Sequence, residues 1–417
     1  MTLRNHVFGI IAFAMLALSI SGCFAPPPPF NPGNNTVPGA AGTVAEGNNR
    51  FAMDMYSQLK NESGNVFLSP FSISTALAMT YEGANGSTAS EMSSVLHLPQ
   101  NDTERREGYA TLIYKINNGG GKSELSTANA LWLQKDRPLL GSYTQDVMQY
   151  YGGNTSLLDF RSDPEGSRSL INSWVENRTN DRIRNLIPEG LITPSTKLVL
   201  INAVYFKGEW VRQFNETDTE DGDFRTGILS SKKVRLMHST DVFNYMENDK
   251  LQMLEMPYSG ANLSMLVLLP KNDDMGSLES SLSVDNLESW KQSLEEQSVQ
   301  VYMPKFKFEK SYMLGDTLQS MGMKQAFEDS ADFSKMTGAK DLKIDVVVHK
   351  AFVEVDEKGT EAAAATAVIM GPTAAAPGHE PPPIPVFRAD HPFIFIIQEK
   401  ASGSILFMGR VSDPSAG

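Results

Sequence analysis

The chain has 417 residues, of which 41% are hydrophobic and 20% are charged, and its formal net charge is −13. This composition is typical of a globular protein with a sizeable core, in one large domain or two. The acidic balance argues against a nucleic-acid-binding protein and against a face that binds polyanions. The two pairs of adjacent basic residues, Arg105-Arg106 and Lys232-Lys233, are expected on solvated faces.

The first residues are typical of an export signal. An apolar run over 7–20 is short for a membrane span but suits the hydrophobic part of a signal peptide, predicted over 1–22. The run ends in Leu18-Ser-Ile-Ser-Gly-Cys23, which resembles the cleavage box of prokaryotic lipoproteins. Cys23 is the only cysteine, so no internal disulfide is possible, and its position favours lipid attachment over burial in the core. We therefore predict a protein outside the cytoplasm, anchored to the cell membrane by lipid or secreted.

A proline-rich stretch separates the signal from the folded body. Residues 23–44 contain a run of four prolines together with glycine and asparagine, which indicates a membrane tether without a core. The folded body is predicted over 45–414.

Within the folded body, helices are predicted early and strands late, without the alternation of a parallel βαβ fold. Helices are predicted over 51–59, 170–186 and 311–322, and Ser69-Pro70 has the cap and first-turn chemistry of another helix start. Strands are predicted over 123–133, 197–206, 234–237, 241–247, 251–257, 263–269, 298–308, 342–355, 393–397 and 405–408. The pattern indicates an α+β fold, and the nearly continuous apolar run over 197–206 indicates a central strand.

The sequence lacks the motifs of common enzymes. It has no Gly-x-Ser-x-Gly, His-Glu-x-x-His, phosphate-binding loop or dinucleotide fingerprint. Its six histidines are far apart, and none has metal-ligand spacing to another histidine or to Cys23. Glu354, Asp356 and Glu357 do not indicate a carboxylate pair, because strand alternation sends neighbours to opposite faces. We therefore predict no catalytic residues, no metal site and no cofactor.

Several spaced motifs resemble those of the serpins, the serine protease inhibitor superfamily, over 45–414. They include Asn65-x-x-x-Ser-Pro-x-Ser-Ile73, Leu200-Ile-Asn-Ala-Val-Tyr-Phe-Lys-Gly-x-Trp210, Gln252-Met-Leu-Glu-Met-Pro-Tyr258, Val348-His-Lys-Ala351 and Phe387-Arg-Ala-Asp-His-Pro-Phe393. The resemblance implies an α+β fold with a large central mixed sheet, two smaller sheets and about nine helices. It also implies an exposed reactive loop, here about residues 357–386.

The alanine-rich stretch 356–371 resembles the hinge of that loop. On local propensity alone it is a short helix or a linker. As an inserted strand it would bury Thr360 and alternate residues after it, which are small or β-branched and uncharged. Residues 360–371 contain no proline and, at about 3.3 Å each, give a strand of roughly 40 Å. The resemblance assigns the hinge to Glu357, Gly359, Thr360, Ala362, Ala363, Ala364 and Ala365.

The resemblance also implies residues that control the opening of the central sheet. They are Ser69, Ser72, Asn202 and His349, which match the family's shutter, and Trp210 and Lys305 at the top of the sheet. Lys305 would pair there with Glu357. From the residues alone, the four shutter side chains are equally well explained as hydrogen-bonded core groups.

Together the resemblance and the hinge indicate a serine protease inhibitor that acts as a suicide substrate. A protease would cleave the loop and form an acyl-enzyme, and the loop would then insert into the central sheet and displace the protease. The alternative is a non-inhibitory serpin that is a binding or chaperone-like module. The expected partner is a target serine protease in a covalent acyl complex. We expect a monomer, with no nucleic-acid partner and no heparin-type cofactor.

The reactive bond is predicted from the family spacing. Counting from Glu357 gives Thr373-Ala374, within a window from Met370 to Ala376. Counting back from Phe393 gives a position near Pro381 instead, so the far side of the loop carries an insertion. The small residues in the window indicate elastase-like or subtilisin-like targets, and Met370 would suit a chymotrypsin-like protease.

Overall fold

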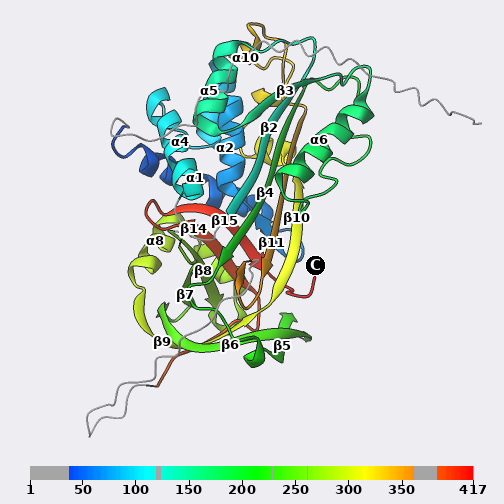
Figure 1. The fold of residues 1–417 in the computed structure, drawn as a ribbon. Helices are drawn as coiled ribbons and strands as arrows, with labels where there is room; N and C mark the ends of the chain where they lie inside the picture. The colour runs from blue at the N-terminus through cyan, green and yellow to red at the C-terminus, as the bar shows by residue number, and fades with distance from the viewer. Residues whose placement is uncertain (1–36, 119–123, 228, 261, 361–382, 417) are drawn as a thin grey trace, which may run out of the picture.

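The structure is a computed structural model that describes residues 37–118, 124–227, 229–260, 262–360 and 383–416 (Figure 1). Two sheets form its frame, one of six strands and one of nine. The described residues contain ten α-helices and fifteen strands, which confirms the predicted α+β class. The predicted signal peptide and Cys23 lie outside the described residues. In the described ranges no helix is both long and apolar enough to cross a membrane.

The six-stranded sheet has the order β10-β11-β12-β4-β2-β3. Its strands are β10 (Phe306–Met313), β11 (Val346–Val355), β12 (Gly359–Thr360), β4 (Leu198–Glu209), β2 (Glu124–Gln134) and β3 (Asn154–Leu158). β4 is buried along almost its whole length and has partners on both edges, which confirms the prediction of a central strand.

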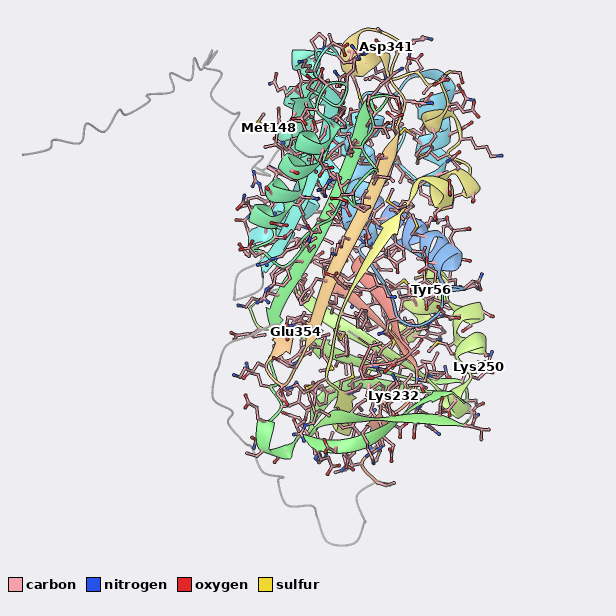
Figure 2. All side chains as sticks on the ribbon, turned by 90° about the vertical axis from the view of Figure 1, so that its right-hand side faces the viewer. Tyr56, Met148, Lys232, Lys250, Asp341 and Glu354 are labelled. Carbon is pink, nitrogen blue, oxygen red and sulfur yellow. The ribbon has the colours of Figure 1, made fainter. Side chains whose placement is uncertain are left out.

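The strands β4 and β11 meet along a line that we call the seam. They run parallel and pair directly from Val346 opposite Val199 to Phe352 opposite Tyr205. Beyond this point β12 lies between them and pairs antiparallel with both. The sheet is therefore closed along its middle and parted at one end, which is the end near Glu354 in Figure 2.

The nine-stranded sheet has the order β1-β15-β14-β8-β7-β6-β9-β13, with β5 paired to β6. Its strands are β1 (Val66–Leu68), β5 (Glu220–Gly227), β6 (Ser230–Glu247), β7 (Leu251–Pro257), β8 (Leu263–Pro270), β9 (Glu295–Pro304), β13 (Val386–Arg388), β14 (Phe393–Glu399) and β15 (Ser404–Val411). The prediction of two strands over 234–247 is wrong, because β9 pairs with β6 continuously from Leu236 to Tyr245. The structure therefore has one nine-stranded sheet where the family resemblance implied two smaller sheets.

Helices cover both faces of the six-stranded sheet. The helices of the described residues are α1 (Ala40–Leu59), α2 (Pro70–Tyr81), α3 (Gly86–Val95), α4 (Asp102–Asn118), α5 (Gly141–Tyr151), α6 (Pro164–Arg178), α7 (Met275–Ser281), α8 (Val284–Gln292), α9 (Gly315–Ser320) and α10 (Ser334–Thr337), of which α7 contacts β8 of the nine-stranded sheet. In the view of Figure 1, α2 lies to the left of the sheet and α6 to its right, and they cover opposite faces. Side-chain alternation along β4 supplies both cores: Leu200 and Val204 join the cluster that contains α2, and Ile201 and Ala203 join that of α6.

Several predicted boundaries are wrong. Helix α1 begins at Ala40, inside the predicted tether, and buries Ala40 and Val44. Its close approach to α4 is possible because Gly108 has no side chain: a Cβ there would lie 2.5 Å from Val44. The predicted helix over 311–322 begins only at Gly315, because pairing with β11 continues β10 as a strand to Met313.

Candidate functional site

The chain leaves β11 through a tight turn and returns into the sheet as β12. Asp356 holds this turn, because its Oδ1 accepts hydrogen bonds from the N–H groups of Lys358 (2.9 Å) and Gly359 (3.1 Å). The N–H of Asp356 in turn donates to the carbonyl of Gly359 at 2.9 Å. Two predicted hinge residues, Gly359 and Thr360, therefore lie within the six-stranded sheet.

Gly359 is required where β12 meets β4. Its backbone φ is +154°, and a Cβ at this position would lie 2.0 Å from the carbonyl oxygen of Gly208. The clash is with backbone, which cannot turn aside as a flexible side chain can. A side chain at position 359 would therefore push β12 out of the sheet.

Thr360 is buried beside Tyr258. Its side chain lies in the core, 1% exposed, with Oγ1 2.8 Å from the hydroxyl of Tyr258. The Tyr258 ring stacks on Trp210, with 4.5 Å between ring centroids. Burial raises the pKa of Tyr258 well above its usual value, so the phenol stays neutral. The only signal for Tyr258 in the sequence is its place in a family motif.

Trp210 fixes the turn from the other side. Its backbone N–H donates to the carbonyl of Lys358 at 2.8 Å, and its indole Nε1 donates to the carbonyl of Asp356 at 3.1 Å. The edge of the Trp210 indole thus contacts the turn, and its face stacks on the Tyr258 ring. The resemblance implied Trp210 at the top of the sheet, and the structure places it beside the turn that leads into β12.

Glu357 ties the turn to neighbouring elements. Lys305, between β9 and β10, donates from Nζ to Oε2 of Glu357 at 2.6 Å, and the hydroxyl of Thr219 donates to Oε1 at 2.8 Å. Desolvation acts to raise the pKa of Glu357, but hydrogen bonds, first that from Lys305, outweigh it and leave the pKa below its usual value. The structure thus contains the Lys305–Glu357 pair that the resemblance implied.

The four predicted shutter residues come together under the middle of the seam, where α2 begins. The N–H of Ser69 donates to Nε2 of His349 at 3.1 Å. The other ring nitrogen, Nδ1, therefore carries the proton and donates to Oδ1 of Asn202. Because His349 lies opposite Asn202 in the pairing of β11 with β4, this contact crosses the seam directly.

A fifth residue, Asn129, extends the group to β2. Asn202 donates from Nδ2 to the Ser72 hydroxyl and to Oδ1 of Asn129, both at 2.5 Å. Asn129 lies opposite Asn202 in the pairing of β2 with β4. A row of polar side chains therefore links three strands to α2. In the sequence, Asn129 is one polar residue within a strand of alternating pattern. This pattern did not identify it as a functional residue.

Burial determines the charge of this group. His349 is fully buried, and desolvation lowers its pKa to about 3. Its ring is therefore neutral at physiological pH. Ser69 and His349 meet through the backbone N–H, while the Ser69 hydroxyl donates to the carbonyl of Leu406 at 2.6 Å. This geometry does not form a nucleophile and base, and among the described residues no three His, Cys, Asp or Glu side chains are grouped as metal ligands.

The remaining predicted loop residues lie outside the described part of the chain. They are Ala362, Ala363, Ala364 and Ala365 of the hinge, and the whole window from Met370 to Ala376 with the bond Thr373-Ala374. The structure describes the chain again from Pro383, shortly before β13.

The prediction that Arg105-Arg106 lies on a solvated face is wrong. Arg105 is 1% exposed and donates to Oε1 of Glu82 at 2.9 Å. Arg106 donates to Oε2 of the same carboxylate at 2.7 Å. Arg105 is therefore enclosed in the core, while Arg106 is partly exposed and reaches in to the buried Glu82 carboxylate. Lys232 of the other basic pair is on the surface, half exposed, and pairs with Asp413 at 2.5 Å.

The chain is similar to known proteins in sequence and in fold. A protein-family model for the serpins, described as serine protease inhibitors, matches residues 46–414. An uncharacterized serpin-like protein of Thermococcus kodakarensis is 45% identical over 370 residues, covering 88% of this chain and 85% of the relative. The leukocyte elastase inhibitor of Bos taurus is 40% identical over 382 residues, covering 89% of this chain and 99% of that protein.

The fold is also similar to that of a solved structure. Human thyroxine-binding globulin in complex with thyroxine superimposes with a TM-score of 0.81 and 32% identity, over 90% of this chain and 99% of that chain. Since the family model covers most of the chain and the relatives align over most of their own length, the chain belongs to the serpin family.

Proposed function

We propose that this serpin inhibits serine proteases as a suicide substrate, and that its cleaved loop inserts between β4 and β11. The observation that carries the proposal is the position of β12, which already pairs antiparallel with both strands at one end of the seam. The rest of the seam needs only to part for the same pairing to continue. A strand added there gains main-chain hydrogen bonds on both edges and buries apolar side chains.

The register of β12 supports the proposal in detail. Thr360 lies opposite Gly208 on β4. Continued antiparallel along β4, this register would bring Thr366 opposite Asn202 and Met370 opposite Leu198, where β4 begins. The inserted strand would thus span the whole of β4, and Met370 at its far end lies a few residues before the proposed reactive bond.

Side-chain alternation adds a second argument. Thr360 points into the core shared with α2, so residues 362, 364, 366 and 368 would follow it there. All four are alanine, threonine or valine, and none carries a charge. Such side chains can enter a close-packed core without large rearrangement.

The proposed targets have a shallow or apolar specificity pocket. The window from Met370 to Ala376 contains mostly small residues, and we place the reactive bond at Thr373-Ala374. The name of the 40% identical leukocyte elastase inhibitor supports an elastase-like target. Subtilisin-like and chymotrypsin-like proteases are the other classes that these residues suit.

Mixing the full chain with elastase, subtilisin and chymotrypsin tests this function. We expect an SDS-stable complex with at least one protease, and mass spectrometry should find a released fragment that begins at Ala374. The variant Thr366→Arg introduces a charge on the buried face and should be cleaved without forming the complex. Its control is Glu361→Arg, because that position already carries a charge on the other face. Cleavage of the wild-type chain without a stable complex would overturn the proposal.

The same experiment separates the alternative, a non-inhibitory binding module. Insertion of the cleaved loop should raise the thermal midpoint sharply, because a strand is added to the sheet. A cleaved chain whose midpoint stays the same favours the alternative. The thyroxine named with the globulin relative is one ligand to examine in that case.

We further propose that lipid attached to Cys23 anchors the protein outside the cytoplasm. The support is the apolar run followed by the small residues before this single cysteine. Cys23→Ser should release the protein from the membrane fraction, and no change in its partitioning would contradict the anchor.

A further inference from the structure

The Tyr258 side chain is held rigidly before it meets the hinge. Its backbone N–H donates to the carbonyl of Leu263 at 3.0 Å, and the residue forms an isolated bridge with Trp210. The ring stacks on Trp210 and meets Phe206 edge-on, with 5.0 Å between those centroids. The direction of its hydroxyl is therefore set by the body of the protein and not by the loop.

Two glycines create the space in which this hydroxyl meets Thr360. A Cβ on Gly208 would lie 2.7 Å from the Tyr258 ring, and a Cβ on Gly359 would strike the Gly208 carbonyl. Without either side chain, β12 approaches β4 closely enough for Thr360 to reach Tyr258. The hydroxyl pair is buried, so loss of one partner leaves the other unsatisfied in the core.

We propose that Tyr258 is a positioning residue that holds Thr360 between β4 and β11 before any cleavage. The sheet is then parted at one end in the intact protein, and strand insertion begins from a residue already in register. The seam remains closed at its middle by Asn202 and His349. Tyr258 thus determines the residue at which insertion starts, and the shutter group limits how far the inserted strand can extend along the seam.

The consequence for inhibition rests on the proposed function. Insertion competes with hydrolysis of the acyl-enzyme, and only fast insertion traps the protease. When the hinge is already docked in the sheet, insertion does not have to begin by ordering these residues, so it is faster relative to hydrolysis. Loss of the Tyr258 hydroxyl should therefore shift the outcome towards cleaved, untrapped product.

Hydrogen exchange of the full chain, followed by mass spectrometry, tests the docking itself. In Tyr258→Phe we expect the backbone amides of β12 to exchange about fivefold faster, the effect of losing one buried hydrogen bond. In Gly359→Ala the added Cβ should clash with the β4 backbone and expel the hinge from the sheet. The β12 amides should therefore exchange faster than in the wild-type chain. Tyr143→Phe is the matched control, because its hydroxyl also donates inside the core, to the carbonyl of Met79 at 3.0 Å.

A rescue variant separates positioning from general destabilisation. Adding Thr360→Val to Tyr258→Phe replaces both hydroxyls by apolar groups of similar shape, so slow exchange at β12 should return. The fraction of cleavage events that trap the protease should fall in Tyr258→Phe and recover in the double variant.

The outcomes distinguish this inference from the proposed function. Unchanged exchange at β12 in Tyr258→Phe, or an equal change in Tyr143→Phe, overturns the positioning role. Faster exchange that Thr360→Val reverses supports the positioning role even in a chain that traps no protease, and in that case only the proposed function fails.

Discussion

His349 on β11 donates from Nδ1 to Oδ1 of Asn202 on β4, at a point where the two strands are direct partners. A strand inserted between β4 and β11 must break this contact. Because Ser69 donates to the other ring nitrogen, the histidine is held in one tautomer and also ties the seam to α2. The pair therefore opposes opening at the middle of the sheet, while β12 is docked at its end.

We predict that His349→Ala weakens the closed sheet. The substitution removes two buried hydrogen bonds and leaves the Asn202 amide oxygen and the Ser69 N–H without these partners, which costs about 1–3 kcal/mol of the free energy of unfolding. Urea unfolding measures this loss. Prolonged warming should also convert the variant to inserted or oligomeric forms, visible on native gels. His97→Ala is the control, because the His97 ring pairs with Asp54 near the surface, where water can replace it.

Acid pH should destabilise the protein through the same histidine. Burial lowers the His349 pKa to about 3, whereas an unfolded histidine has a pKa of about 6.5. Below about pH 6.5 the unfolded chain therefore binds a proton that the folded chain does not. Stability is fully present above that pH and falls as the pH drops towards 3, by about 1.4 kcal/mol per unit. Urea midpoints at about pH 7.5 and 5 measure the loss.

The control for this pH dependence is His349→Gln, which removes the titrating group and keeps a polar side chain. Carboxylates elsewhere titrate in both proteins, so the difference between the two pH profiles isolates the histidine. Parallel profiles would show that another group determines the acid sensitivity.

Lys305 and Glu357 should be coupled in stability. We predict that Lys305→Glu and Glu357→Lys each lower the thermal midpoint, because each replaces an ion pair of 2.6 Å by two like charges. The double exchange should recover part of the loss, with a coupling of about 0.5–1 kcal/mol, since the lysine is 39% exposed and water screens the pair. Additive losses in the double variant would show that the two side chains do not interact.

Most of the fold and part of the site could be predicted from the sequence. The apolar run over 197–206 indicated a central strand, and Ser69-Pro70 indicated the start of α2; both are confirmed. Family motifs named Asn202 and His349, and the structure brings them together across the seam. These features depend on local pattern or on residues that a motif preserves.

The features that could not be predicted depend on contacts between distant segments. The continuity of β6 is set by its pairing with β9 and not by its own polar middle. Asn129 joins the shutter group only because β2 pairs with β4 in one register. Tyr258 meets Thr360 across 102 positions of sequence, through space left by two glycines. No local propensity contains this information.

The buried carboxylate of Glu82 is a further feature that the sequence did not reveal. Its two oxygens accept hydrogen bonds from Arg105 and Arg106, and the Tyr151 hydroxyl donates to it at 2.6 Å. Desolvation acts to raise the pKa of Glu82, but the arginines and the tyrosine outweigh it and leave the pKa below its usual value. The carboxylate is therefore charged at neutral pH and links α2 with α4 and α5.

We predict that Glu82→Gln is strongly destabilising, by about 3–5 kcal/mol, because it removes the charge of the buried carboxylate that pairs with Arg105 and leaves that guanidinium with Asp102, a carboxylate that is 66% exposed. Asp146→Asn is the matched control: it removes another carboxylate that contacts Arg106, at 2.8 Å, but at a site 28% exposed. Water can replace that partner, so the control should lose less than about 1 kcal/mol. Urea unfolding measures both losses. Equal losses would mean that water also reaches Arg105 once Glu82 is neutral. The charge of Glu82 would then not be needed to stabilise the packing of α4 against α2.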